Sequence, residues 1–369
     1  MKSVMRNLVI ALFCMTFILS CSKNPSPSED YMILDDVEYV KDFPIHTDLG
    51  NAEESGFDVI GVLNFQVCDT MLMVSLKGET DGFWQFYSLK EKNLIGKMLG
   101  IGQGPNEFLM PVYSENQYTI KKAANKWYAS IYDNMRGGIY RLDIDGTLQG
   151  ENLLLQKVNS DLAGGLISVK ELEDDSFICR ELAEQMTEQN RYVLKNGEKV
   201  VPETLNMLNM SKVLDGDGGF YDMNLISSSI RIHDNLIVEV PVYLNYINLY
   251  SLDGSVRKTI CMDKSLSSIS SLQAQKNTAR KQTYTAVQTF DAFFGVCAYY
   301  HTADEEDSGA ELFSQIQLFS YEGKPLASFR LNRQVSAFDI DFTNGDLYVL
   351  SSSTDEFVKY DISDLLRKL

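Results

Sequence analysis

Residues Ile247–Ile260 have the sequence INLYSLDGSVRKTI, and the fold can be predicted from this pattern and its repeats. Apolar and polar residues alternate through INLYS, as they do along a β-strand whose two faces meet different surroundings. Asp253 and Gly254 then supply the residues that a tight hairpin turn prefers, and VRKTI returns as a second strand. The stretch is therefore predicted to be a β-hairpin.

The same phrase, an apolar strand followed by a turn and a shorter strand, occurs six times in the chain. The copies begin at Phe86, Ile139, Tyr192, Ile247, Ile316 and Val358, at successive offsets of 53, 53, 55, 69 and 42 residues. Two further strand-like runs separate the copies, which gives four strands per repeat. Four-stranded antiparallel sheets repeated around an axis form a β-propeller, because a closed ring protects the sheet edges. We therefore predict an all-β, six-bladed β-propeller; the regular spacing disfavours the alternative, a pair of β-sandwich domains.

The propeller is predicted to span residues 36–369. The last phrase is followed by too few residues for a fourth strand, so the outer strand of the last blade is expected from the N-terminal run VEYVKDFPI, Val37–Ile45. The longest interval between copies contains Asp263–Gln282, which is rich in Ser, Gln and Ala and poor in β-branched residues. That composition predicts a helical or irregular insertion.

The first residues have the pattern of a bacterial lipoprotein signal peptide. A basic start precedes an apolar run, Leu8–Leu19, that is too short to cross a bilayer. The run ends in Ile18–Cys21, ILSC, which fits a lipobox, so residues 1–20 are expected to be removed and Cys21 to carry acyl chains. An ordinary signal peptide is the alternative. Residues 21–35, which include SKNPSPSED, are expected to form a flexible tether.

The net charge and the spacing of the cysteines indicate which partners and which covalent links are expected. The chain has 51 acidic and 33 basic residues and a formal charge of −18, which repels phosphate backbones, so nucleic acid is not expected as a partner. Four cysteines lie at long, irregular spacings inside apolar runs: Cys68, Cys179, Cys261 and Cys297. Buried free thiols are favoured, although an exported protein can also form disulfides and their presence is left open.

The glycine-rich stretch Gly100–Phe108, GIGQGPNEF, does not predict a nucleotide site. Pro105 and Asn106 follow the last glycine, so no helix begins where a pyrophosphate would need its N-terminus, and the P-loop lysine is missing. The stretch lies where the chain crosses from the first blade to the second, and glycine suits a tight crossing. Glu107 is expected to accept hydrogen bonds from the amides of this loop.

Several of these stretches resemble one family. GIGQGPNEF, SYEGKPLASFRLNRQVSAFDID (Ser320–Asp341) and the ending NGDLYVLSSSTDEFVKYDI (Asn344–Ile362) resemble the TolB-like six-bladed β-propeller lipoproteins of the Bacteroidetes, over nearly all of the mature chain. The resemblance implies the propeller fold and an acyl anchor in the outer membrane, facing the periplasm or the cell surface. That family is largely uncharacterised, so the resemblance implies no activity.

Propellers generally bind ligands at a mouth of the central channel. We expect this mouth where the blade crossings meet the turns between second and third strands, which are predicted at Lys77–Gly82, Asp133–Gly138, Glu181–Arg191, Pro241–Tyr246, His301–Ser314 and Ser352–Glu356. The candidate ligand-binding residues on this face are Glu107, Asp133, Arg136, Tyr243, Tyr246 and His301. Aromatic rings and planar polar groups suit a sugar or a peptide, but each can equally be a solvated turn charge or a packed ring.

The sequence offers little for catalysis or metal binding. Only three histidines are present, and none belongs to a zinc-binding motif. Asp215, Asp217 and Asp222 in LDGDGGFYD are candidate calcium ligands, but the pattern departs from a calcium-binding loop. Calcium apart, no cofactor is expected.

The sequence therefore predicts a monomeric, membrane-anchored envelope lipoprotein that binds a glycan, a peptide or an envelope protein without catalysis. The alternative is a propeller hydrolase or lyase acting on polysaccharide, because a glycosidase needs only two carboxylates and this acidic chain has many. Convergent carboxylates at the mouth would favour the enzyme. Aromatic rings with scattered hydrogen-bonding groups would favour the binding protein.

Overall fold

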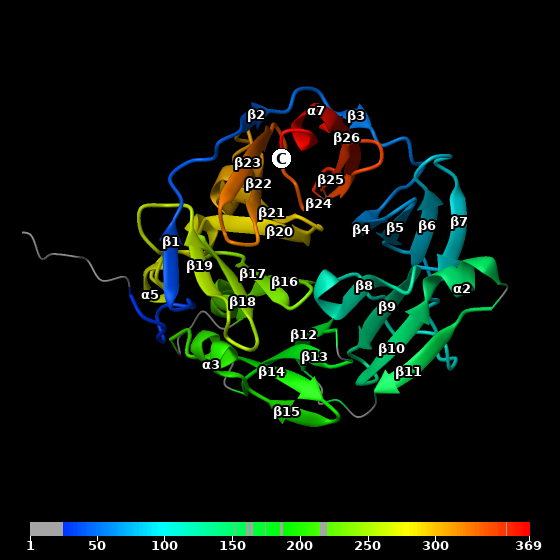
Figure 1. The fold of residues 1–369 in the computed structure, drawn as a ribbon, viewed down its shortest axis with the longest axis horizontal. Helices are drawn as coiled ribbons and strands as arrows, with labels where there is room; N and C mark the ends of the chain where they lie inside the picture. The colour runs from blue at the N-terminus through cyan, green and yellow to red at the C-terminus, as the bar shows by residue number, and fades with distance from the viewer. Residues whose placement is uncertain are drawn as a thin grey trace, which may run out of the picture.

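Six antiparallel sheets stand around a central axis, and the chain visits them in order (Figure 1). In each sheet, or blade, the first strand lies at the axis and the later strands lie progressively outward. The predicted six-bladed, all-β propeller is confirmed. The computed structural model describes residues 25–150, 152–159, 162, 165–173, 175–184, 187–214, 220–351 and 353–369.

The strands of the first three blades run, from the axis outward, as follows. Blade one has β4 (Val62–Cys68), β5 (Met71–Leu76), β6 (Trp84–Ser88) and β7 (Leu94–Met98). Blade two has β8 (Tyr118–Ala123), β9 (Lys126–Asp133), β10 (Gly138–Asp143) and β11 (Leu155–Asn159). Blade three has β12 (Leu166–Glu171), β13 (Phe177–Leu182), β14 (Gln189–Lys195) and β15 (Glu198–Val200).

Blades four to six each gain a strand from the N-terminal segment. Blade four has β16 (Ser228–His233), β17 (Leu236–Pro241), β18 (Tyr246–Ser251), β19 (Arg257–Cys261) and β1 (Asp36–Tyr39). Blade five has β20 (Gln282–Thr289), β21 (Phe293–His301), β22 (Ser314–Ser320), β23 (Pro325–Leu331) and β2 (His46–Asp48). Blade six has β24 (Ala337–Asp341), β25 (Asp346–Ser351), β26 (Glu356–Asp361) and β3 (Glu53–Glu54).

Helices are short and lie in the connections. They are η1 (Glu115–Gln117), α2 (Ile144–Gln149), α3 (Glu203–Asn209), α4 (Phe220–Met223), η2 (Asn224–Ile226), α5 (Ile269–Gln273), η3 (Asn277–Ala279), α6 (Ala303–Asp307) and α7 (Ser363–Leu366). The insertion expected at Asp263–Gln282 contains α5 and η3, in agreement with its composition.

Packing between blades holds the ring together. Every residue of β5, MLMVSL, is buried, and the same is true of β18 and β25. A strand buried on both faces is typical of a sheet covered on both sides. Six apolar clusters occupy the six spaces between neighbouring blades, so each sheet buries its two faces against its two neighbours.

The six repeated phrases coincide with the third strand and the following connection of the six blades. In blade four the turn is as predicted, with Gly254 at φ +78°. In blade two the phrase is interrupted, because IDGTLQ forms α2 instead of a tight turn. The Asp143 side chain accepts a hydrogen bond from Gly146 N at 2.7 Å and so caps this helix.

The N-terminal segment closes the last blade, but the prediction that Val37–Ile45 does so is wrong. The outer strand of blade six is β3, which pairs antiparallel with β26. Val37–Ile45 includes most of β1, which pairs in parallel with β19 of blade four, and β2 pairs in parallel with β23 of blade five. We call residues 36–54 the N-terminal belt. A strand that joins an edge in parallel needs no adjacent hairpin, so the local sequence could not show which edge it meets.

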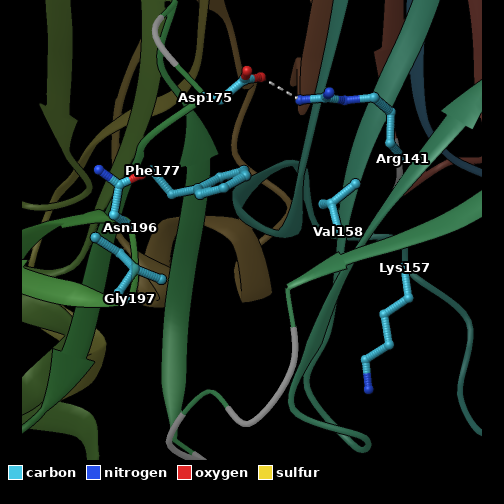
Figure 2. A pocket seen from close by; sticks show the side chains of 8 residues that line it. Arg141, Lys157, Val158, Asp175, Phe177, Asn196 and Gly197 are labelled. Carbon is cyan, nitrogen blue, oxygen red and sulfur yellow. Dashed lines mark hydrogen bonds and ion pairs between the residues drawn. The ribbon is translucent and has the colours of Figure 1, made fainter.

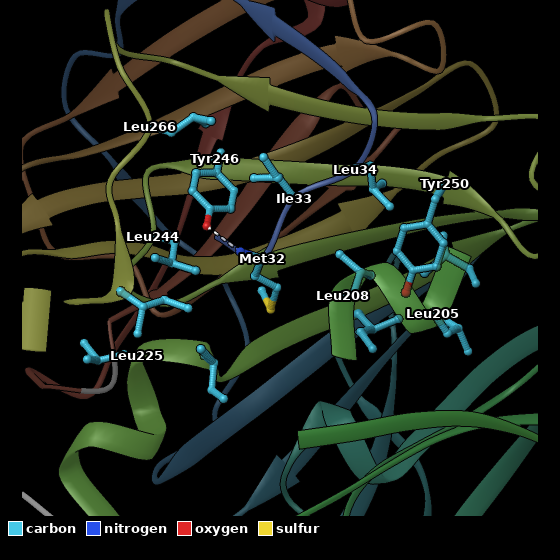
Figure 3. Packing of buried hydrophobic residues seen from close by; sticks show 14 of the residues in the cluster. Met32, Ile33, Leu34, Leu205, Leu208, Leu225, Leu244, Tyr246, Tyr250 and Leu266 are labelled. Carbon is cyan, nitrogen blue, oxygen red and sulfur yellow. Dashed lines mark hydrogen bonds between the residues drawn. The ribbon is translucent and has the colours of Figure 1, made fainter. Parts of the chain in front are cut away.

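Residues 21–35 are also not a tether throughout. Met32–Leu34 are fully buried in the apolar cluster between blades three and four (Figure 3). Met32 N donates a hydrogen bond to the Tyr246 hydroxyl at 3.1 Å. These three consecutive apolar residues follow a polar run, so they were predicted to belong to the tether. Their removal from water lowers the free energy, and the chain therefore docks before the belt begins.

The cysteines of the propeller body are buried free thiols, as favoured from their apolar surroundings: Cys68, Cys179, Cys261 and Cys297. Burial raises the pKa of Cys179 to about 12 and those of Cys261 and Cys297 to about 11. Thiols in this state are poor nucleophiles and act as small apolar side chains.

A buried ionic cluster joins blades three and four. Glu239 of β17 is fully buried and lies 2.7 Å from Arg191 of β14 and 3.6 Å from Arg180 of β13. The hydroxyls of Ser228 and Tyr250 also donate to its carboxylate. Burial alone would raise the pKa of Glu239, but the two guanidinium groups and these hydrogen bonds lower it to about 2. The carboxylate is thus the counter-ion of two buried cations.

Replacement of this carboxylate should cost much of the stability of the ring. In Glu239→Gln the two guanidinium groups lose their counter-ion, so the free energy of unfolding should fall by roughly 3–5 kcal/mol. Urea denaturation at pH 7 measures the change. Glu203→Gln is the matched control, because Glu203 pairs with Arg257 at 2.8 Å but is 74% exposed, and it should have little effect. Equal losses in the two variants would contradict the role given to Glu239.

Candidate functional site

A hollow that could hold a ligand lies on the axis of the propeller. A pocket of 780 Å³ is lined by residues from all six blades, namely by the ends of the inner strands and by the turns that follow them. Asp69, Trp127, Asp234, Phe290 and Phe342 lie at or next to turns between first and second strands. The pocket therefore opens on the face that carries these turns.

The predicted mouth is on the opposite face. The turns between second and third strands lie where the sequence placed them, and they share a face with the blade crossings. The pocket, however, faces the other way, because the helix η1 fills the axis on the crossing side. Asn116 Nδ2 donates to Ser228 O of blade four, and Arg231 pairs with Glu115 at 2.5 Å.

Lys170 of β12 helps to hold η1 in the axis. Its ammonium group donates to the carbonyl oxygens of Glu115 and Tyr118 and lies 5.6 Å from the centre of the Tyr118 ring. Burial, together with the nearby Arg231, lowers the pKa of Lys170 well below its usual value. The carbonyl groups and the ring compensate a charge that has lost its water.

Glu171, the next residue, is neutralised from the neighbouring blade. Its carboxylate, which is 1% exposed, pairs with Lys121 at 2.8 Å and with Arg141 at 2.6 Å. The hydroxyl of Ser130 also donates to it. Glu171 N donates to Thr119 Oγ1 at 3.1 Å. These contacts tie blade three to blade two and leave this carboxylate fully occupied.

Asp339 of β24 is the titratable group of the pocket with the most unusual surroundings. It is 6% exposed, and its two oxygens accept hydrogen bonds from Val67 N and Ile340 N, each at 2.8 Å. Burial raises its pKa to about 7, because the two amide hydrogen bonds only partly replace the lost water. Asp339 thus links blade six to blade one and changes charge near neutral pH.

The rim of the pocket is exposed and mixed in character. Asp69 pairs with Lys122 at 2.5 Å and accepts a hydrogen bond from Trp127 Nε1 at 3.3 Å. Glu173 and Asp291 are exposed and make no hydrogen bond or ion pair within the described part of the chain. The two charged rim side chains without an ion-pair partner in the described part of the chain, Glu173 and Asp291, are therefore both acidic.

Three predicted site residues cluster at the first blade crossing. Glu107 accepts a hydrogen bond from Gly104 N at 2.7 Å, which is the loop contact expected for it. A side chain at Gly102 would collide with this carboxylate, so the glycine serves a close approach. Arg136 donates twice to Gly104 O at 3.3 Å, and buried Asp133 accepts from Arg136 N. These three side chains thus stabilise the crossing and the turn beside it.

The other three candidates do not belong to this group, and Tyr243 and Tyr246 belong to the apolar cluster between blades three and four. Tyr246 is completely buried, so it presents no surface to a ligand. Tyr243 is partly buried and packs against the apolar cluster that contains Tyr246. His301 is 7% exposed and accepts a hydrogen bond from Phe313 N at 3.3 Å. Alternation along a strand places such residues on one of two faces, but only the neighbouring blade decides whether that face is covered.

Two of the three calcium candidates, Asp215 and Asp217, lie outside the described residues, as does Cys21. Asp222 is described and is occupied, since it pairs with Arg280 at 2.8 Å and accepts from Gln273 Nε2 at 2.9 Å. Within the described ranges no group of three His, Cys, Asp or Glu side chains could hold a metal ion.

Comparison with known proteins supports the architecture. No protein-family model matches the chain, and no curated protein matches it. A member of the DUF4221 family from Bacteroides vulgatus superposes with a TM-score of 0.50 at 9% identity, over 85% of this chain and 94% of that chain. At this identity the likeness shows the fold alone.

Two further solved structures are similar at lower scores. A candidate exported protein from Bacteroides fragilis gives a TM-score of 0.45 at 10% identity, over 86% of this chain and 88% of its own. A calcium-binding protein, regucalcin, from Agrobacterium tumefaciens gives 0.45 at 10% identity, over 86% and 95%. The resemblance to TolB-like lipoproteins stays a prediction. In the described part of the chain no helix is long and apolar enough to span a membrane.

Asp339 should give the protein a characteristic pH dependence. Its folded-state pKa of about 7 lies above the ordinary value of 3.8, so the folded state keeps a proton that the unfolded chain releases. The free energy of unfolding therefore falls as the pH rises from about 4 to about 7. Asp339→Asn lacks this titration and should gain stability relative to the wild type across that window, by up to a few kcal/mol.

Thermal or urea unfolding at pH 4, 5.5, 7 and 8 measures this difference. Asp291→Asn is the control, because Asp291 is exposed on the same rim, and its curve should run parallel to the wild type. A pH dependence of Asp339→Asn that matches the wild type would show that Asp339 keeps an ordinary pKa.

Proposed function

We propose that this chain is a lipid-anchored binding protein of the cell envelope whose ligand, a glycan or a peptide, occupies the axial pocket. One observation carries the proposal: all six blades contribute to a 780 Å³ hollow, and η1 lies behind its wall against blades two, three and four. A concave site of this size with a few polar groups at a rigid wall is the usual form of a ligand site.

The chemistry of the wall supports binding without catalysis. Each buried carboxylate is engaged by other groups of the protein, since Glu171 neutralises Lys121 and Arg141, and Asp341 accepts from the amides of Thr343 and Asn344. Lys170 and Arg231 are likewise occupied by η1. These groups shape the pocket and are not free to attack a substrate or to transfer its protons.

The rim favours a ligand that donates hydrogen bonds. Glu173 and Asp291 offer carboxylate oxygens, and the rings of Trp127 and Phe342 lie at the same opening. Phe342 is 53% exposed, so its ring presents apolar surface to solvent. Sugar hydroxyls over an aromatic ring, or the amide and ammonium groups of a peptide, match this combination.

A polysaccharide hydrolase or lyase is the second candidate, and Asp339 is the observation in its favour. A carboxyl group with a pKa of about 7 could exchange a proton near neutral pH. Both of its oxygens are held by backbone amides, however, and Asp339 lies at the wall between blades one and six. Product analysis of any ligand found for the pocket separates the two functions.

A thermal-shift screen of the mature chain against glycans and envelope peptides tests the proposed site. A ligand of the pocket should raise the melting temperature, because it binds the folded state alone. Trp127→Ala or Asp291→Ala should weaken the apparent affinity for that ligand at least tenfold, which is seen as a smaller shift in melting temperature at the same ligand concentration. Arg136→Ala, on the opposite face, should leave it unchanged. A shift lost only in Arg136→Ala would move the site to the blade crossings, and no shift with any ligand would contradict the proposal.

Anchoring by Cys21 is tested separately from ligand binding. In a bacterial host with lipoprotein processing, the wild type should be found in the membrane fraction and Cys21→Ser in the soluble fraction, because the serine variant cannot carry acyl chains. Labelling with a radioactive or clickable fatty acid should follow the same pattern. Membrane association of Cys21→Ser equal to the wild type would show that another feature holds the protein there.

A further inference from the structure

The N-terminal belt shows what the outer rim of this propeller accepts. Its β1 and β2 add fifth strands to blades four and five. Between these elements, Val40 and Phe43 fill the outer space between blades four and five. Leu49 does the same between blades five and six, and Ile45 packs against the apolar cluster of that space. An extended segment with regularly placed apolar residues therefore fits the groove between two blades.

The belt does not reach blades one to three. Within the described residues no strand pairs with the outer edges of β7, β11 and β15. Their apolar side chains are exposed: Leu94 by 41%, Ile95 by 39%, Val158 by 38% and Val200 by 49%. On β19 and β23, which the belt covers, Ile260 and Phe329 are completely buried. Open edges with exposed apolar residues are surfaces to which another strand can add.

A groove lies between blades two and three, beside the outer strand β11 that the belt does not cover. It has a volume of 620 Å³, with Val158 of β11 on one wall and Phe177 and Leu194 of blade three on the other. Figure 2 shows the Phe177 ring pointing across the groove towards the Val158 side. Arg141 of blade two pairs with Asp175 of blade three at 2.8 Å and bridges one end.

The charge at this groove complements an acidic strand. On blade four, Lys258 of β19 pairs with Glu38 of the belt at 2.8 Å, while Val37 and Tyr39 of the belt pack on the apolar cluster. At the groove, Lys157 of β11 makes no ion pair within the described part of the chain. The open edge therefore presents a lysine like the one that the belt neutralises on blade four.

We propose that the groove between blades two and three binds an extended acidic segment of a partner protein, which adds to β11 as a fifth strand. An apolar side chain of that segment lies against Val158, Phe177 and Leu194, and a carboxylate pairs with Lys157. Main-chain hydrogen bonds to the strand edge supply affinity, and the alternating side chains supply selectivity. This surface is at the periphery of the ring and functions whether or not the axial pocket holds a ligand.

Two synthetic peptides and the full-length protein test the proposal. The first peptide has the sequence of residues 36–49, and in the second Asp36, Glu38, Asp42 and Asp48 are replaced by lysine. Fluorescence anisotropy should show saturable binding of the acidic peptide, at least tenfold weaker binding of the lysine peptide, and at least tenfold weaker binding of the acidic peptide to Lys157→Glu/Val158→Glu.

The control variant Ile60→Glu/Lys324→Glu makes the same chemical changes at exposed positions away from the groove and should bind the acidic peptide like the wild type. Circular dichroism establishes that both double variants are folded. Absence of saturable binding, or equal binding by both double variants, would overturn the proposal. Dimers in sedimentation equilibrium that Lys157→Glu/Val158→Glu dissociates would overturn it as well, because the occupant would then be a second copy of this chain.

Discussion

Burial of both faces of every sheet is the constraint on which this structure depends. A single blade such as β4–β7 would leave an apolar face in water on either side, and only a closed ring gives each face a neighbour. Closure is completed where blade six meets blade one. There Phe57 and Tyr348 pack in one apolar cluster, and Val67 N donates to Asp339 across the joint. The belt then supplies β3, so the N-terminal segment and the last blade complete the ring together.

The polar axis is a consequence of that closure. Six inner strands converge on the axis, and the charged side chains that are buried there need partners from the protein. Lys170 and Arg231 find theirs on η1, and Glu171 finds them on blade two. Because η1 enters from the side of the blade crossings, the axis is filled at that end. The space that remains opens on the other face, and this asymmetry places the candidate ligand site.

The rim is asymmetric as well. The belt covers the outer edges of blades four to six and buries Ile260 and Phe329 beneath it, while Val158 stays exposed on blade two. The same chain thus has two separate surfaces for the ligands that we propose, an axial pocket for a glycan or a peptide and a peripheral edge for a strand. The chain is hydrogen-bonded to the propeller from Glu29 onwards, so the lipid that we propose at Cys21 would hold both close to a membrane.

The repeat, the number of blades and the positions of their turns could be predicted from the amino-acid sequence, because alternation and turn residues are local properties of the chain. The sequence also indicated the Glu107 contact, since glycines beside a carboxylate are close in sequence. The axial pocket was not predicted. Lys170, Glu171 and Asp339 are charged residues within otherwise apolar strands, and this pattern could have indicated a polar site.

Which face is open, which candidate residues are covered and which strand edges the belt joins became known only from the folded chain. Tyr246 is buried because Met32 folds onto it from a distant part of the chain. The pocket opens on the face opposite to the predicted mouth, and η1 lies on the predicted side against the inner strands β8, β12 and β16. The strand β1 joins β19 by parallel pairing. These outcomes depend on contacts between residues far apart in sequence, whose free energies no local pattern records.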